Sequence, residues 1–151
     1  MKLLALDLGT KTGWAVYVGP GTIFSGAWDL KPSRFSGGGM RFVRFVGFLT
    51  ELHKSVGYDR VVFEEVRRHM STDAAHVYGG LMATLTMFCE DKGLPYEGVP
   101  VGTIKKSWTG KGNASKAEMV AEAKKRGFYP QSEDEADALA ILHTVVGVQD
   151  V

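Results

Sequence analysis

The sequence predicts an α/β fold in which a mixed five-stranded sheet carries helices on both faces. The first 28 residues contain three apolar runs separated by short glycine-containing turns, a pattern typical of strands joined as hairpins. Each of the later apolar runs, at 61–66 and 94–99, follows a segment with helical periodicity. Such an order is typical of strands that extend a sheet through helical crossovers.

The opening run, residues 2–8, is apolar almost throughout and contains one acid, Asp7. A continuous run of this kind predicts a central strand that is buried on both faces. Residues 12–18 and 22–28 are expected to follow as antiparallel strands. Because a buried carboxylate is costly unless something pairs with it, Asp7 is a candidate ligand of a divalent cation or of a nucleotide-bound metal. A hairpin-stabilising role is the structural alternative.

Two long helices are expected between the strands. Residues 40–56 place apolar side chains three and four positions apart, which predicts a helix with a broad apolar face. A second helix is expected to begin near Ser71 and to run to about Lys92. The pair Gly79-Gly80 within it is unfavourable for a helix and favours close approach of another backbone, such as a second subunit.

The C-terminal third is expected to be helical. Residues 100–108 predict a short helical or irregular segment, and 109–114 predict a flexible loop. The pattern Ser-x-x-Glu at 115–118 is a capping box that opens a helix ending at Gly127. A second such pattern at 132–135 opens the last helix, which is expected to end near Val146.

Composition places the chain among ordinary globular proteins. Its 151 residues predict a single domain over 1–151, with 44% hydrophobic and 23% charged residues. One cysteine, Cys89, excludes an internal disulfide framework and a cysteine-based zinc site. Since we find neither a membrane-length apolar run nor a signal-peptide pattern, we expect a cytoplasmic protein with no membrane partner.

The charges are segregated although the net charge is only +1. Acids cluster near the predicted strand ends and at 133–137, whereas bases cluster at 67–68, 105–106 and 124–126. An acidic site inside a basic rim is expected of a metal-dependent enzyme that acts on a polyanion. An ordinary mixed surface is the alternative for any single cluster.

Four acids form a candidate site. Asp7 and Glu64 lie on strands that can be parallel neighbours, and Asp134 and Asp137 are three residues apart on one helix face. Four converging carboxylates repel one another unless hard divalent cations lie among them, and an all-oxygen ligand set selects Mg²⁺ or Mn²⁺. Two such ions about 4 Å apart can activate a water and stabilise the leaving oxygen of a phosphodiester. Glu64 and Glu65 are alternative candidates for the strand's ligand position. Their side chains point to opposite faces of the sheet, so only one of them can join the site.

These residues resemble a known family, the RuvC-type Holliday junction resolvases. The resemblance extends in order over almost the whole chain, and its motifs are Asp7-Leu-Gly-Thr-Lys-Thr-Gly-Trp14, Phe63-Glu-Glu-Val66, Lys105-Lys106 before Thr109-Gly-Lys-Gly-Asn-Ala-Ser-Lys116, and Asp134-Glu-Ala-Asp-Ala-Leu-Ala140. The last motif is the most specific, because the first also occurs in RNase H, transposases and actin-like or sugar-kinase ATPases. We expect a diverged or phage-encoded member, located in the host cytoplasm in the latter case.

The resemblance implies an RNase H-like fold and a homodimer. It further implies Mg²⁺-dependent resolution of four-way DNA junctions by paired symmetric nicks, in which a metal-activated water leaves 5′-phosphate ends. Mn²⁺ would substitute for Mg²⁺, with two ions per site. The implied metal ligands and catalytic residues are Asp7, Glu64, Asp134 and Asp137. The expected DNA-binding residues are Arg67, Arg68, Lys105, Lys106, Lys111 and Lys116.

One segment departs from the family pattern. After the catalytic Glu, family members often carry an aromatic side chain that enters the junction, whereas residues 66–70 here contain neither Phe nor Tyr. Arg67 and Arg68 can take over this role by phosphate contact or stacking.

Three other functions are compatible with parts of this pattern. A broader branched-DNA or flap endonuclease would use the same acids, and a non-catalytic junction-binding module would not need them. An ATP-binding protein of the actin type would share the opening motif, but such folds need two domains of this size. The sequence indicates no helicase partner and no cleavage dinucleotide.

Overall fold

A computed structural model of the chain describes residues 1–147, so the end of the predicted domain, 148–151, lies outside the described residues. The strands are β1 (Leu3–Asp7), β2 (Lys11–Gly19), β3 (Thr22–Asp29), β4 (Arg60–Glu65) and β5 (Tyr96–Pro100). The helices are α1 (Met40–Val56), α2 (Thr72–Lys92), α3 (Val101–Thr109), α4 (Lys116–Lys125) and α5 (Glu133–Val146). No helix among the described residues is long and apolar enough to span a membrane.

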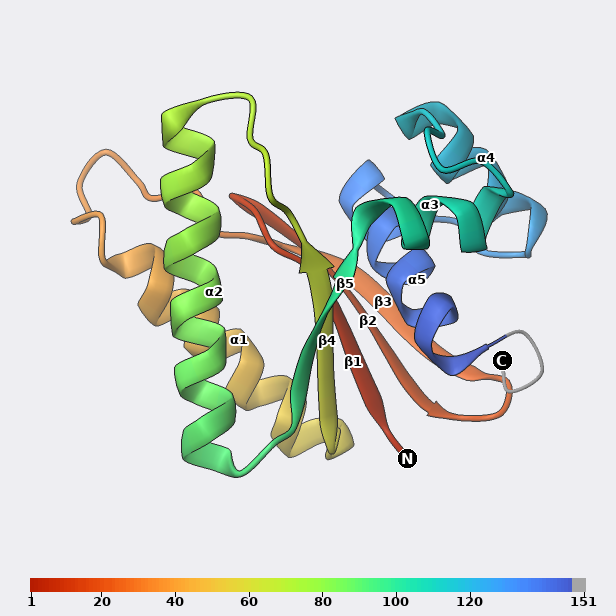
Figure 1. Ribbon diagram of the computed structural model, residues 1–151. Coiled ribbons are helices and arrows are strands. Elements are labelled where there is room, and N and C mark those ends of the chain that lie inside the picture. Colours follow the sequence, from red (N-terminus) through yellow and green to blue (C-terminus); the bar gives the residue numbers. More distant parts are fainter. Residues whose placement is uncertain (148–151) are drawn as a thin grey trace.

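The five strands form one mixed sheet in the order β3-β2-β1-β4-β5 (Figure 1). β1 pairs antiparallel with β2, and β2 pairs antiparallel with β3. β4 lies parallel to β1, and β5 lies parallel to β4. The predicted α/β fold with a hairpin sheet extended by crossovers is therefore confirmed.

Helices cover both faces of the sheet, with α1 and α2 on one face and α3, α4 and α5 on the other (Figure 1). Alternation along β1 divides its side chains between two cores. Leu4 and Leu6 pack with α1 and α2, whereas Leu3 and Ala5 pack with α5. All four of these side chains are fully buried, which explains the continuous apolar run in the sequence.

The glycine pair in α2 differs from the prediction. A Cβ atom on Gly80 would lie 2.6 Å from the Phe42 ring of α1, while the space in front of Gly79 is open. The expectation of an approaching backbone is therefore wrong for Gly80, because a side chain of the same chain fills that space. It stays a prediction for Gly79.

The two predicted capping boxes have different outcomes. Ser115 and Glu118 make both reciprocal hydrogen bonds at the start of α4, as predicted. At the start of α5, the Ser132 hydroxyl accepts from the Glu135 amide, but the Glu135 carboxylate accepts from the amide of Gln131 instead of that of Ser132. The second box is therefore incomplete, because a contact with β3 draws the Glu135 side chain away from the cap.

Candidate active site

Asp7 and Glu64 lie side by side where the neighbouring central strands β1 and β4 end. Each directly follows the last pair of the parallel β1–β4 ladder, which joins Leu6 to Phe63. Asp7 shares the sheet face of Leu3 and Ala5, and Glu64 shares the face of Val62, which is the face covered by α5. Two strand ends thus direct two carboxylates toward the same helix.

The same alternation separates Glu64 from Glu65. The Glu65 side chain points to the opposite face, where it lies next to a Cβ position of Gly98. Its carboxylate forms an exposed ion pair with Arg67 at 3.1 Å. Of the two neighbouring acids, only Glu64 faces α5, which is the choice that the family resemblance also makes.

The first turns of α5 bring the other two acids to these strand ends. The backbone of Asp134 lies directly against Gly13, so closely that a Cβ atom there would overlap the Asp134 carbonyl oxygen. Gly13 is the residue that pairs with Asp7 in the β1–β2 ladder. Asp137 lies one turn further along α5 on the same face as Asp134. Both aspartates therefore lie over the end of β1.

The charges of the other three acids act on Asp7. Burial, followed by the charges of Asp137, Glu64 and Asp134, raises the pKa of Asp7 well above its usual range. Burial also raises the pKa of Glu64. Burial and the charges of Glu64 and Asp134 raise the pKa of Asp137 to about 7. Each of these three partly buried acids is therefore easier to protonate than a free carboxyl group.

Two lysines face the acids. Lys105 of α3 and Lys116 of α4 both lower the pKa of Glu64, against the effect of its burial. Burial lowers the pKa of Lys116, but the charges of Asp137 and three other acids outweigh it, so the net shift is upward. Lys105 lines a small cavity together with Glu64 and Asp137. These lysines thus offset part of the repulsion.

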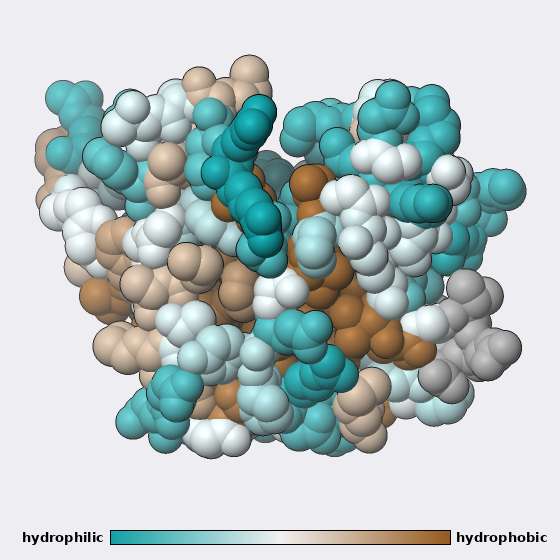
Figure 2. Space-filling view, in the orientation of Figure 1, coloured by the Kyte–Doolittle hydropathy of each residue, from teal (hydrophilic) through white to brown (hydrophobic). Residues whose placement is uncertain are grey.

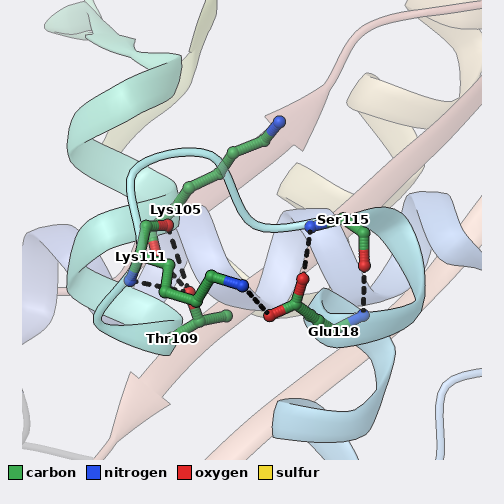
Figure 3. Close-up of polar contacts among 5 residues, drawn as sticks. All are labelled: Lys105, Thr109, Lys111, Ser115 and Glu118. Atoms are coloured by element: carbon green, nitrogen blue, oxygen red, sulfur yellow. Dashed lines mark hydrogen bonds and ion pairs between the residues drawn. The ribbon is translucent and has the colours of Figure 1, made fainter.

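A hydrogen-bonded network joins the end of α3, where Lys105 lies, to the loop before α4 (Figure 3). The Thr109 hydroxyl donates to the Lys105 carbonyl at 2.9 Å and accepts from the Lys111 amide at 3.1 Å. The Lys111 amino group pairs with Glu118 at 2.9 Å, and Glu118 also caps α4. In Figure 3 the Lys105 amino group extends away from this network and stays available.

The remaining predicted DNA-binding residues do not converge on the acids. Arg67 and Arg68 are exposed on the segment between β4 and α2, and Lys106 is exposed on α3. Figure 2 shows a notch between the part of the molecule formed by α2 and this segment and the part formed by α3 and α4, with hydrophilic residues along its rim. The three residues stay predicted DNA contacts.

The ligand chemistry at the site fits a hard divalent cation, since every donor is a carboxylate oxygen. Among residues 1–147, however, no group of three or more His, Cys, Asp or Glu side chains is arranged to hold a metal ion by itself. Mg²⁺ is commonly held by one or two carboxylates, with water and substrate phosphate completing its shell. Pairs of carboxylates whose remaining metal ligands are water or a bound phosphate are compatible with both observations.

A cavity of about 750 Å³ lies next to the site, on the side of α1 and α2. Its lining includes Gly9 and Thr10, which follow Asp7 closely, and the side chains of Arg41, His69 and His76. Sequence analysis did not identify this cavity, because three distant segments assemble it and no local pattern marks it.

His143 has a structural position. Its ring is buried between Trp108 and Phe128, with centroid distances of 4.9 and 5.3 Å, and its Nδ1 lies 2.7 Å from the Leu139 carbonyl oxygen. Burial lowers its pKa. His143 thus belongs to the packing between α3 and α5.

Comparisons with known proteins relate this fold to junction resolvases. RuvC of Thermus thermophilus in complex with a Holliday junction substrate superposes with a TM-score of 0.78 and 22% sequence identity, covering 95% of this chain and 92% of that chain. A second Thermus thermophilus RuvC structure gives a TM-score of 0.76 at 22% identity, with 95% and 92% coverage. The yeast mitochondrial Holliday junction resolvase Ydc2 gives 0.65 at 14% identity, covering 94% of this chain and 76% of that chain.

No protein-family model and no curated protein sequence matches the chain. At these identities the superpositions establish the fold. The chain has the RNase H-like fold in the form found in RuvC, and the resemblance read from the motifs is confirmed at that level.

Proposed function

We propose that this protein is a Mg²⁺-dependent endodeoxyribonuclease that resolves four-way DNA junctions by paired symmetric nicks. The observation that carries the proposal is the convergence of Asp7, Glu64 and Asp137 with the first turn of α5 at one sheet edge, beside Lys105. The structural similarity to junction resolvases supports junction resolution as the activity.

Each group at the site has a proposed part. Asp7, Glu64, Asp134 and Asp137 would hold divalent cations, Mg²⁺ or in its place Mn²⁺, with two ions per site. Bound there, such ions supply water activation and stabilisation of the leaving oxygen in phosphodiester hydrolysis, which leaves 5′-phosphate ends. Lys105 and Lys116 would hold the phosphates that flank the scissile bond, and Arg67, Arg68, Lys106 and Lys111 would contact the junction arms.

A homodimer would supply two such sites related by two-fold symmetry, one for each of two opposing strands. The exposed side of α1 and α2 is the proposed interface. It carries the exposed apolar side chains of Val43 and Met87, and Gly79 leaves open space on the same helix pair. A mixed dimer with one Asp7→Asn subunit should then nick a single strand of the junction.

The experiment compares an immobile four-way junction, a linear duplex and a 5′-flap as substrates in Mg²⁺ and Mn²⁺. The proposal expects paired nicks on the junction and little cutting of the duplex. Equal cutting of flaps would replace it with a broader branched-DNA nuclease. Junction binding without cleavage in either metal would indicate a binding module. Because binding rests on phosphate contacts, it should weaken steeply with salt.

A further inference from the structure

One buried acid of α5 has no part in the proposed function. Glu135 lies between Asp134 and Asp137 in the sequence but is only 7% exposed, which makes it the most buried of the helix's acidic residues. A buried carboxylate requires hydrogen-bond partners. The partners of Glu135 show what it does.

Both carboxylate oxygens of Glu135 are engaged away from the other acids. Oε2 accepts from the Ser25 hydroxyl at 2.7 Å, and Oε1 accepts from the Gln131 amide at 2.9 Å. Ser25 lies on β3, the edge strand that is separated from β4 and Glu64 by two other strands. Glu135 therefore joins the first turn of α5 to the far side of the sheet and to the loop before the helix.

A close contact on β2 complements this link. Gly13 brings the backbone of α5 against the strand next to Asp7, since its missing side chain leaves room for the Asp134 carbonyl. The Ser132 hydroxyl fixes the start of the helix by accepting from the Glu135 amide at 3.2 Å. Three contacts thus fix the first turn of α5: the packing of its backbone on β2, the hydrogen bond to Ser25 of β3, and the Ser132 cap.

We propose that Glu135 is a positioning residue that fixes the first turn of α5 on β2 and β3, so that Asp134 and Asp137 face Asp7 and Glu64. This inference rests on the proposed function, because it assigns a purpose to that orientation. Helical geometry explains the arrangement, since Asp134 and Asp137 share a face while Glu135 points about 100° away from Asp134.

A positioning role and a ligand role predict opposite effects of a conservative change. Glu135→Gln keeps the shape, one acceptor for the Gln131 amide and a donor for the Ser25 hydroxyl oxygen. Glu135→Ala removes both links. A ligand would lose its function in both variants, whereas a positioning residue is rescued by Gln. Glu133→Gln is the control for loss of a carboxylate in the same helical turn, because Glu133 is exposed and its only ion pair among the described residues, with Lys116 at 3.7 Å, is a solvent-exposed contact of little energetic weight.

The test measures Mn²⁺ affinity by calorimetry and single-turnover junction cleavage for the wild type and these three variants. We expect Glu135→Ala to lose about 10-fold to 100-fold in metal affinity and cleavage rate, with Glu135→Gln and the control within about threefold of the wild type. Metal-free junction affinity should be equal in all four proteins, since Glu135 is buried and both of its carboxylate oxygens are bound within the chain. Ser25→Ala removes one link only and should give an intermediate loss, which keeps the test informative if Glu135→Ala does not fold.

The two proposals fail in different ways. Equal metal affinity and rate in the wild type, Glu135→Ala and Ser25→Ala overturn the positioning role and leave the nuclease intact. A loss in Glu135→Gln as large as in Glu135→Ala overturns it in favour of a ligand. If the wild type binds Mn²⁺ but does not cut, the proposed nuclease activity is overturned. The metal affinities of the variants then still decide whether Glu135 has the positioning role. A wild type that neither binds Mn²⁺ nor cuts overturns both.

Discussion

Asp137→Asn should make the metal-free protein more stable while it removes cleavage. Burial, then the charges of Glu64 and Asp134, raises the pKa of Asp137 from 3.8 to about 7, so its ionised form opposes folding. At about 1.4 kcal/mol per pKa unit, ionisation costs the fold about 4 kcal/mol at pH 8. Because the replacing amide is polar and keeps part of the burial cost, we expect a gain of about 2 kcal/mol.

The pH dependence follows from the sign of this shift. A carboxyl group whose pKa is higher in the folded state binds protons more tightly there, so ionisation destabilises the fold as the pH rises. The destabilising contribution of Asp137 should therefore grow between about pH 4 and pH 7 and then level off. Asp137→Asn should follow the wild type closely near pH 4 and exceed it above pH 7.

Thermal unfolding in EDTA, at a series of pH values from 4 to 8, measures the effect. For a chain of this length, a gain of about 2 kcal/mol corresponds to roughly 4–8 °C in Tm. Glu133→Gln is the control, because that exposed acid should contribute little. An Asp137→Asn protein that is less stable than the wild type at pH 8 would refute the convergence of repelling carboxylates.

Three further predictions concern the sheet edge, the helix packing and the metal. Glu64→Gln should lower the cleavage rate at least about 10²-fold, whereas Glu65→Gln, on the opposite sheet face, should leave the chemical step unchanged; single-turnover assays compare them. Gly80→Ala should lower the free energy of unfolding by about 1–3 kcal/mol in urea titrations because its methyl group collides with Phe42, while Gly79→Ala should not destabilise the chain. Excess Mg²⁺ should raise Tm in the wild type, and EDTA should reverse the rise; a Tm that is insensitive to both would count against the metal site.

Most of the fold could be predicted because its signals are local. The apolar run of β1 and the 3.6-residue periodicity of α1 reflect burial on two faces and on one face, respectively. The start of α4 carries both halves of its capping box within four residues. Such patterns need no knowledge of the rest of the chain.

The parts that escaped prediction depend on distant residues. Glu135 lies at the capping-box position of its helix. Its carboxylate instead accepts a hydrogen bond from Ser25, which lies 110 positions earlier in the chain. Gly80 has the sequence of an interface glycine, but Phe42 fills its space. The choice between Glu64 and Glu65 required the pairing of β4 with β1, which alternation alone does not fix.

Cleavage of an immobile four-way junction by the wild type and Asp7→Asn, with the nicks mapped to the nucleotide and the products treated with DNA ligase, tests the central claim most directly. The account predicts Mg²⁺-dependent nicks at symmetric positions that ligase can seal, and an Asp7→Asn protein that binds the junction without cutting it. Cutting that persists in Asp7→Asn, or that needs no divalent cation, would contradict the assignment of the site.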